Sequence, residues 1–105
     1  MTADTDSYQV KGLQIDLKTG RIVRDGRTQA LSRREIRLLK YFLEHAGEVL
    51  SRDELLRSVW GYRSATVSRT VDMHIVWLRQ KIEEDPREPR LIVTVYGQGY
   101  RFDKH

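Results

Sequence analysis

The chain of 105 residues contains no cysteine, which excludes disulfide bonds, thiolate metal ligands and a cysteine nucleophile. It also lacks any apolar run approaching the ~20 residues of a membrane span, and its N-terminus has no basic and apolar blocks of a signal peptide. We therefore expect a cytoplasmic protein with no membrane association. The length suits one compact domain.

Patterns typical of catalysis and metal binding are also scarce. The three histidines, His45, His74 and His105, have no metal-ligand spacing. The segment Gly97-Gln98-Gly99 follows a strand pattern but opens no helix, so it is not a phosphate-binding loop. We predict that the chain is not an enzyme and has no catalytic residue, metal site or cofactor.

Positive charge is what the sequence has in excess, with a formal net charge of +4. Much of it lies in one region, whereas the following segment EEDPRE, residues 83–88, is mainly acidic. Between residues 51 and 82 the basic residues are Arg52, Arg57, Arg63, Arg69, Arg79 and Lys81, against Asp53, Glu54 and Asp72. A local excess of this kind favours a polyanionic partner, although many basic proteins bind none.

The first part of the chain has the alternation of strands. Within residues 8–31, Asp25-Gly26 favours a tight hairpin, because both central positions of that turn need positive φ. We predict an antiparallel meander of three or four strands. The polar segment MTADTDS, residues 1–7, is predicted to be a linker or a disordered N-terminus, which leaves residues 8–105 for the domain.

Two helices begin with the same signal. Ser32 with Glu35, and Ser51 with Glu54, have the spacing of a capping box. The first helix is predicted to bury Ile36, Leu39, Phe42 and Leu43 and to stop at Gly47; the second is predicted to bury Leu55, Leu56 and Val59 and to stop at Gly61. The short connection between them forces direct packing, which is the first half of a helix-turn-helix.

A third helix is predicted from near Thr66 or Ser68 to about Glu83, with Pro86 beyond its end. Its core stripe is Val71, Ile75, Leu78 and Ile82. The segment LIVTVYGQGYRF, residues 91–102, then predicts a hairpin. The fold class is therefore α+β: a winged helix-turn-helix with an N-terminal antiparallel sheet, a three-helix core and a C-terminal β-hairpin wing.

The other face of the third helix is the candidate binding site. Opposite the core stripe lie Arg69, Met73, Val76 and Gln80, with Trp77 beside them and Thr70 and His74 on one flank. A basic end, an apolar centre and an amide suit the major groove of DNA, where Gln80 could read an adenine edge. Two alternatives remain: the apolar residues pack within the domain, or the winged helix is a protein-protein interaction module.

Three further interpretations concern the wing residues, Arg79 and a possible RNA partner. In the wing, Tyr96, Gln98, Tyr100 and Arg101 could either pack in the hairpin or contact a sugar-phosphate backbone. Arg79 points to neither face of the helix, and we expect it to pair with a carboxylate such as that of Glu35 or Asp53. RNA binding through GQGYRF is a weaker alternative, because the rest of an RNA-recognition pattern is missing.

The segments VWGY, SRTVDMHIVWLRQKIEEDP and LIVTVYGQGYRF resemble the C-terminal effector domain of OmpR/PhoB-type response regulators, over about residues 8–103. The resemblance implies a third helix in the major groove and a wing tip along the adjacent minor groove. The phosphate contacts it implies fall on Trp60, Arg69, Thr70, His74 and Tyr100, with Thr94 also able to approach the DNA. Val76 and Trp77 stand where some relatives have arginine, and Tyr96 replaces a wing-tip arginine, so we expect a different operator.

The same resemblance implies partners. Double-stranded DNA is the first, with tandem copies of the domain on it, and RNA polymerase is the second, through the loop at residues 61–67. The family joins this domain to an N-terminal receiver of a two-component phosphorelay, which is absent from this chain. The chain is accordingly expected to be an excised effector domain or a stand-alone regulator.

Overall fold

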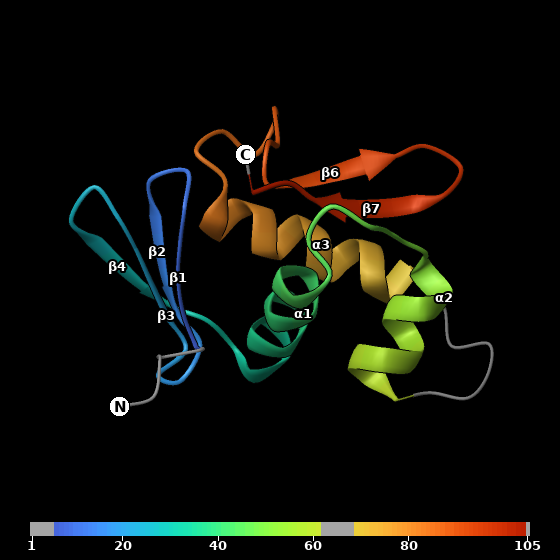
Figure 1. Cartoon of the computed structure of the whole chain (residues 1–105), viewed down its shortest axis with the longest axis horizontal. Coiled ribbons are helices and arrows are strands. Elements are labelled where there is room, and N and C mark those ends of the chain that lie inside the picture. The colour runs from blue at the N-terminus through green and yellow to red at the C-terminus, as the bar shows by residue number, and fades with distance from the viewer. Residues whose placement is uncertain (1–5, 62–68, 105) are drawn as a thin grey trace.

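The computed structural model describes residues 6–61 and 69–104. The first four strands form one antiparallel sheet in the order β1-β2-β3-β4, at one end of the molecule (Figure 1). They are β1 (Ser7–Val10), β2 (Leu13–Asp16), β3 (Arg21–Arg24) and β4 (Arg27–Ala30). Asp25 and Gly26 have φ of 51° and 77° and close the predicted hairpin. β1 begins at Ser7, one residue before the predicted domain boundary.

Helix α1 (Arg33–Glu44) begins with the predicted capping box. The Glu35 N–H donates to Ser32 Oγ over 3.1 Å, and the Ser32 N–H donates back to the Glu35 carboxylate over 2.8 Å. The prediction that Ile36 is buried is wrong, because it is only partly covered and lies against Gly20 at the turn before β3. Leu38, which the sequence reading missed, is fully buried in the core.

The second helix differs in detail from its prediction. β5 (Val49–Leu50) precedes α2 (Arg52–Leu55), whose Ser51 cap accepts from the Glu54 N–H. The second half of this capping box is wrong, because the Glu54 carboxylate accepts the Tyr41 hydroxyl instead, over 2.7 Å. The helix then widens into a π-helical turn, η1 (Leu56–Trp60), and ends at the predicted Gly61.

Helix α3 (Arg69–Ile82) lies between α1 and the wing, as Figure 1 shows. Its predicted start at Thr66 or Ser68 falls outside the described residues. The wing consists of β6 (Ile92–Val95), β7 (Gly99–Phe102) and the turn between them. β5 pairs with β7 as the third strand of this second sheet, in the order β5-β7-β6, and the sequence reading missed it.

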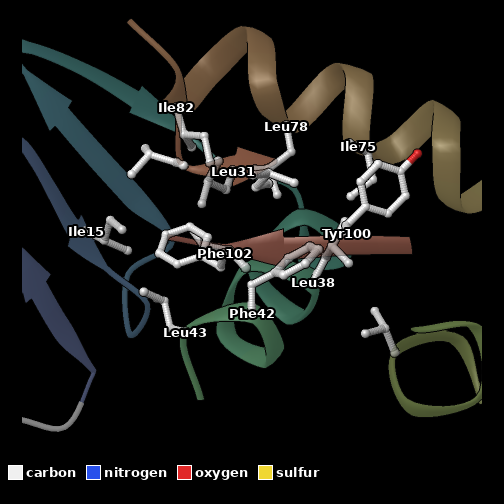
Figure 2. Close-up of a cluster of buried hydrophobic side chains, with 14 of the residues drawn as sticks. Ile15, Leu31, Leu38, Phe42, Leu43, Ile75, Leu78, Ile82, Tyr100 and Phe102 are labelled. Atoms are coloured by element: carbon white, nitrogen blue, oxygen red, sulfur yellow. The ribbon is translucent and has the colours of Figure 1, made fainter. Parts of the chain in front are cut away.

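The core fills the space between the two sheets and the helices (Figure 2). All four residues of the predicted α3 stripe have no exposed surface: Val71, Ile75, Leu78 and Ile82. Phe42 of α1 and Phe102 of β7 meet there with ring centroids 6.2 Å apart. This winged-helix architecture confirms the predicted fold class. No helix in the described part of the chain is both long and apolar enough to cross a membrane.

Candidate nucleic-acid interface

The face of α3 opposite the core is open to solvent. Met73 is 43% exposed, Val76 45% and Trp77 45%, and Arg69 and Gln80 at the two ends of this face are exposed as well. The three apolar side chains therefore do not pack into the domain, so that alternative is wrong. The prediction that these five residues share an outward face is confirmed, because all five are exposed and lie on the side of the helix opposite the buried stripe.

A row of aromatic rings borders this face. His74 lies between Trp60 and Trp77, with ring centroids 5.0 Å from each and edge-to-face geometry. His74 Nδ1 is 2.9 Å from the Thr70 carbonyl, which can only accept, so Nδ1 carries the hydrogen and Nε2 is the nitrogen left for another partner. The predicted residues Trp60, Thr70 and His74 are thus brought together at one edge of α3.

The sequence reading missed the residue that supports the other side of Trp60. The Arg34 guanidinium lies 5.1 Å from the Trp60 ring centroid and donates to the Val59 carbonyl over 2.7 Å. An arginine over an indole ring is attracted by the partial negative charge on the face of the ring. Nothing in the sequence pattern relates α1 to η1 at these positions, so only the tertiary packing reveals the contact.

Asp72, also missed, joins three elements at the N-terminal end of α3. Its carboxylate accepts from Arg52 Nε over 2.8 Å and from the Tyr100 hydroxyl over 2.6 Å. Burial raises the pKa of Asp72, but the hydrogen bonds from Arg52 and Tyr100 outweigh it and hold this pKa below its usual value. The negative charge of Asp72, in the first turn of α3, is therefore already paired.

Tyr100 is mostly buried, at 6% exposure, which places it in the hairpin packing. Burial first, and then the hydrogen bond to Asp72, raises its pKa to about 12. A phosphate contact by Tyr100, predicted from the family resemblance, would therefore involve a hydroxyl whose hydrogen is already donated to a carboxylate.

Arg79 connects α3 to the wing. Its guanidinium donates to the Ile92 carbonyl over 2.8 and 3.1 Å and to Thr94 Oγ1 over 2.8 Å, and it lies 5.5 Å from the Tyr100 ring centroid. The predicted carboxylate partner is wrong. Glu35 pairs with Lys81 instead, over 2.8 Å. The Ile92 carbonyl accepts from the Arg79 guanidinium without bringing a second charge into this half-buried site. Thr94, a predicted interface residue, is partly buried here.

The wing tip is the most exposed part of the candidate interface. Tyr96 is 90% exposed, and the Gln98 N–H closes the turn by donating to the Val95 carbonyl over 2.9 Å. Arg101 pairs with Asp103 over 2.7 Å, and its side chain is 37% exposed. Of the wing residues left open by the sequence, Tyr96 and Gln98 face solvent and Tyr100 packs in the hairpin. Arg101 is partly exposed and paired with Asp103.

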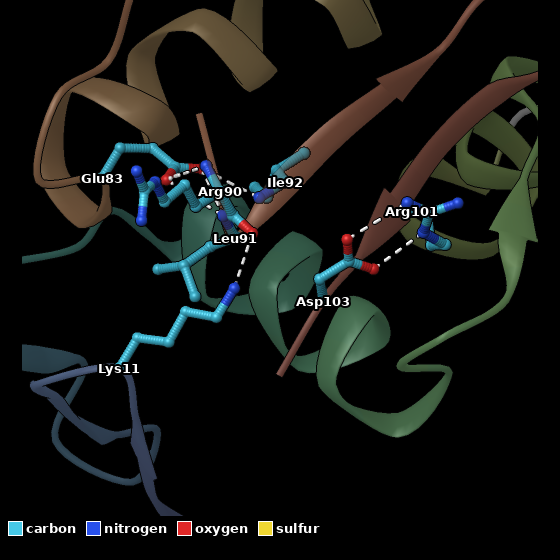
Figure 3. Close-up of polar contacts among 7 residues, drawn as sticks. All are labelled: Lys11, Glu83, Arg90, Leu91, Ile92, Arg101 and Asp103. Carbon is cyan, nitrogen blue, oxygen red and sulfur yellow. Dashed lines mark hydrogen bonds and ion pairs between the residues drawn. The ribbon is translucent and has the colours of Figure 1, made fainter. Parts of the chain in front are cut away.

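Glu83 fixes the base of the wing to the end of α3 (Figure 3). This buried carboxylate accepts from the N–H groups of Arg90, Leu91 and Ile92 over 2.8 to 3.1 Å. Lys11, from the turn between β1 and β2, donates to the Arg90 carbonyl over 3.1 Å. The start of β6 is therefore held against the end of α3.

Within residues 6–61 and 69–104, no group of three or more His, Asp or Glu side chains could hold a metal ion. The loop predicted to contact RNA polymerase, residues 61–67, lies outside the described residues apart from Gly61. What the described residues present is a basic, aromatic and apolar helix face beside a projecting hairpin.

Residues 26–102 match the family model described as "Transcriptional regulatory protein, C terminal". The chain is 44% identical over 91 residues to the alkaline phosphatase synthesis transcriptional regulatory protein SphR of Synechococcus elongatus, which covers 87% of this chain and 35% of that protein. The chain thus spans about a third of the length of this relative.

Two solved structures have the same fold. The RstA DNA-binding domain of Klebsiella pneumoniae, in complex with the RstA box, has a TM-score of 0.82 and 32% identity, covering 94% of this chain and 98% of that one. The DNA-binding domain of CadC from E. coli has a TM-score of 0.79 and 37% identity, covering 95% of this chain and 94% of that one. With most of its length matched in sequence and in fold, the chain belongs to the OmpR/PhoB-type family of transcriptional regulatory protein C-terminal domains.

Proposed function

We propose that this chain binds double-stranded DNA sequence-specifically, as the effector domain of a two-component transcriptional regulator. The observation that carries the proposal is that α3 has two faces. One face is the fully buried stripe of Val71, Ile75, Leu78 and Ile82, and the opposite face is open to solvent. A helix of this size fits the major groove, and the wing tip then lies at the adjacent minor groove. The similar RstA DNA-binding domain of Klebsiella pneumoniae, which was solved in complex with the RstA box, supports binding to DNA.

The interface residues divide by chemistry. Arg69, Thr70, His74 and the indole N–H of Trp60 can hold phosphates, which set position and register without reading sequence. Gln80 and the apolar residues between it and Arg69 face the base edges. In the wing, Tyr96 is free to enter the minor groove. Thr94 and Tyr100 act mainly by fixing the wing to the domain, and any DNA contact they make is at the part of the wing nearest α3.

Salt dependence tests the proposal directly. Binding to duplex fragments should weaken steeply between low and physiological salt, because each phosphate contact releases counterions and adds about 0.9 to the slope of log K against log salt concentration. Fluorescence anisotropy at several salt concentrations measures this slope. Undetectable duplex binding, or binding unaffected by salt, would favour the alternative in which the exposed apolar residues contact a partner protein.

Two substitutions separate positioning from reading. Arg69→Ala should lower affinity for all duplexes about equally and reduce the salt slope by about 0.9. Gln80→Ala should instead relax preference at one base pair, with a discrimination loss of about 1–3 kcal/mol. A panel of single-base variants of one operator measures both effects. The same loss at every base for both variants would contradict this division.

The longer protein extends the proposal. Because relatives such as SphR are about three times as long, we infer that an N-terminal receiver precedes this domain in the natural cytoplasmic regulator and that the loop at residues 61–67 meets RNA polymerase. Tandem copies should occupy direct repeats. Selection of bound sites from random DNA tests this, since repeats spaced by about one helical turn are expected.

A further inference from the structure

Three contiguous side chains form an apolar patch in the middle of the exposed α3 face. The patch consists of Met73, Val76 and Trp77, each between 43% and 45% exposed, and the polar residues Arg69 and Gln80 lie beyond its two ends. None of the three carries a group that matches the amide or carbonyl edges of bases, apart from the indole N–H. In the major groove the one apolar group on a base edge is the C5-methyl of thymine, or of 5-methylcytosine.

Trp77 is the member of the patch that is held in place by neighbouring side chains. Trp77 is in edge-to-face contact with His74, which is in turn held by the Thr70 carbonyl and by the Trp60 ring. Trp60 is itself covered by the Arg34 guanidinium. A side chain already fixed in place loses little conformational entropy when it meets a ligand, so a small apolar contact retains most of its free energy.

The surroundings of the patch favour DNA over an apolar protein as its occupant. Arg69 brings a positive charge, and the nearby carboxylate of Asp72 is paired with Arg52. Three side chains also make a small surface, whereas a stable protein interface has about 20–30 residues on each side. The patch is thus large enough for one or two methyl groups and small for a protein partner.

We propose that the apolar patch is a reader of pyrimidine C5-methyl groups, so that the preferred operator carries thymine or 5-methylcytosine beneath Val76 and Trp77. This inference rests on the proposed DNA binding and names the class of duplex that the site selects. Recognition comes from withdrawing a methyl group from water into the patch, and it needs no hydrogen bond.

Removing single methyl groups from the DNA tests the proposal. The best site from a random-duplex selection is synthesised with deoxyuridine in place of each thymine in turn, which deletes the methyl and keeps base pairing. Affinity should fall about three- to fivefold at one to three positions and stay unchanged elsewhere, the factor expected for exposing one methyl group. Methylating cytosine should restore the same factor when cytosine replaces the sensitive thymine.

Protein variants assign the effect to the patch. Trp77→Ala and Val76→Ala should each abolish the deoxyuridine effect at their own position, while Gln80→Ala, the matched control on the same face, should retain it. Site-specific binding that is insensitive to deoxyuridine throughout, or equal sensitivity in all three variants, would overturn the methyl reader and leave DNA binding intact. Absence of duplex binding by the wild type would instead overturn the proposed function.

Discussion

At the scale of single residues, Asp72 does more than its position in the sequence indicates. One carboxylate accepts hydrogen bonds from the start of α2 through Arg52 and from β7 through Tyr100, and it belongs itself to α3. The part-buried hydrogen bond from Tyr100 to the charged carboxylate contributes about 1.5–3 kcal/mol. The Arg52 pair is more exposed and screened by solvent, so it contributes about 0–1 kcal/mol. The cost of partly burying the charge is offset only while both donors are in place.

Tyr100 should make the free energy of unfolding depend on pH in alkaline solution. Its pKa is raised to about 12 in the folded protein from 10.0, so the folded state keeps a proton that the unfolded chain has lost. The free energy of unfolding should therefore fall as the pH rises from about 10 to about 12, by roughly 2 kcal/mol. Urea denaturation across this range should show that Tyr100→Phe has lost this part of the decline.

The exposed Tyr96 supplies the control for that experiment. Tyr96→Phe removes a hydroxyl from a wing-tip residue that is 90% exposed, so the alkaline decline should persist in this variant. An identical decline in wild type and Tyr100→Phe would mean that other groups cause it.

At the scale of elements, the wing sheet depends on a close approach between β5 and β7. Gly99 has φ of 145°, and a Cβ there would overlap the carbonyl group of Leu50 on the neighbouring strand. The Leu50 carbonyl belongs to the backbone, so it cannot move away from an added Cβ by a change of side-chain rotamer. The glycine is therefore required by the space between the strands as well as by its own conformation.

Gly99→Ala should destabilise the domain by more than about 3 kcal/mol, because it adds both a backbone clash and a strained φ. Gly97→Ala is the matched control: φ is 78° there, but no atom lies within 4 Å of the added Cβ, so only about 1–2 kcal/mol of conformational cost is expected. Thermal denaturation compares the two. Equal losses of stability would show that the clash is relieved by movement of β5.

Local chemistry explains which elements the sequence predicted. The Ser32 cap and the Val71 to Ile82 stripe depend on neighbours within a few residues, and both are confirmed. β5 is two residues long, too short for any alternation to appear, so pairing with β7 had no sequence signal. The burial of Ile36 was predicted wrongly for a related reason. The periodicity of α1 predicts an apolar stripe, but it does not predict which edge of the stripe is covered by the rest of the domain.

At the scale of the whole molecule, α3 and the wing form one body. Arg79 ties the last turn of α3 to Ile92 and Thr94, and Glu83, directly after the helix, is bonded to the backbone where β6 begins. The outward face of α3 could be predicted from the helical repeat. The partners of Arg79 could not, because a guanidinium can be satisfied equally by a carboxylate or a carbonyl and the choice is made by tertiary packing.

Arg79→Lys should loosen the wing relative to α3. An ammonium group keeps the charge but cannot repeat the forked contact to the Ile92 carbonyl and Thr94 hydroxyl, so stability should fall by about 1–3 kcal/mol. Hydrogen exchange of the β6 and β7 amides should accelerate, and duplex binding should weaken for all sequences.

Arg101→Lys is the control for this change. It alters a charge pair with Asp103 on the far side of the wing, two residues along the same chain segment, and should leave the exchange rates nearly unchanged. Equal acceleration in both variants would indicate a general loss of stability rather than a specific link between α3 and the wing.

The π-helical turn η1 makes the orientation of Trp60 depend on residue count. Each residue of a helix advances the side-chain direction by about 100°, and a wide turn accommodates one residue more than an α-helical turn does. Deleting one residue from Leu56–Trp60 would restore the regular winding and swing the indole away from His74 and Arg34. A frame-preserving deletion in η1 would thus alter recognition by α3 while leaving every residue of α3 itself unchanged.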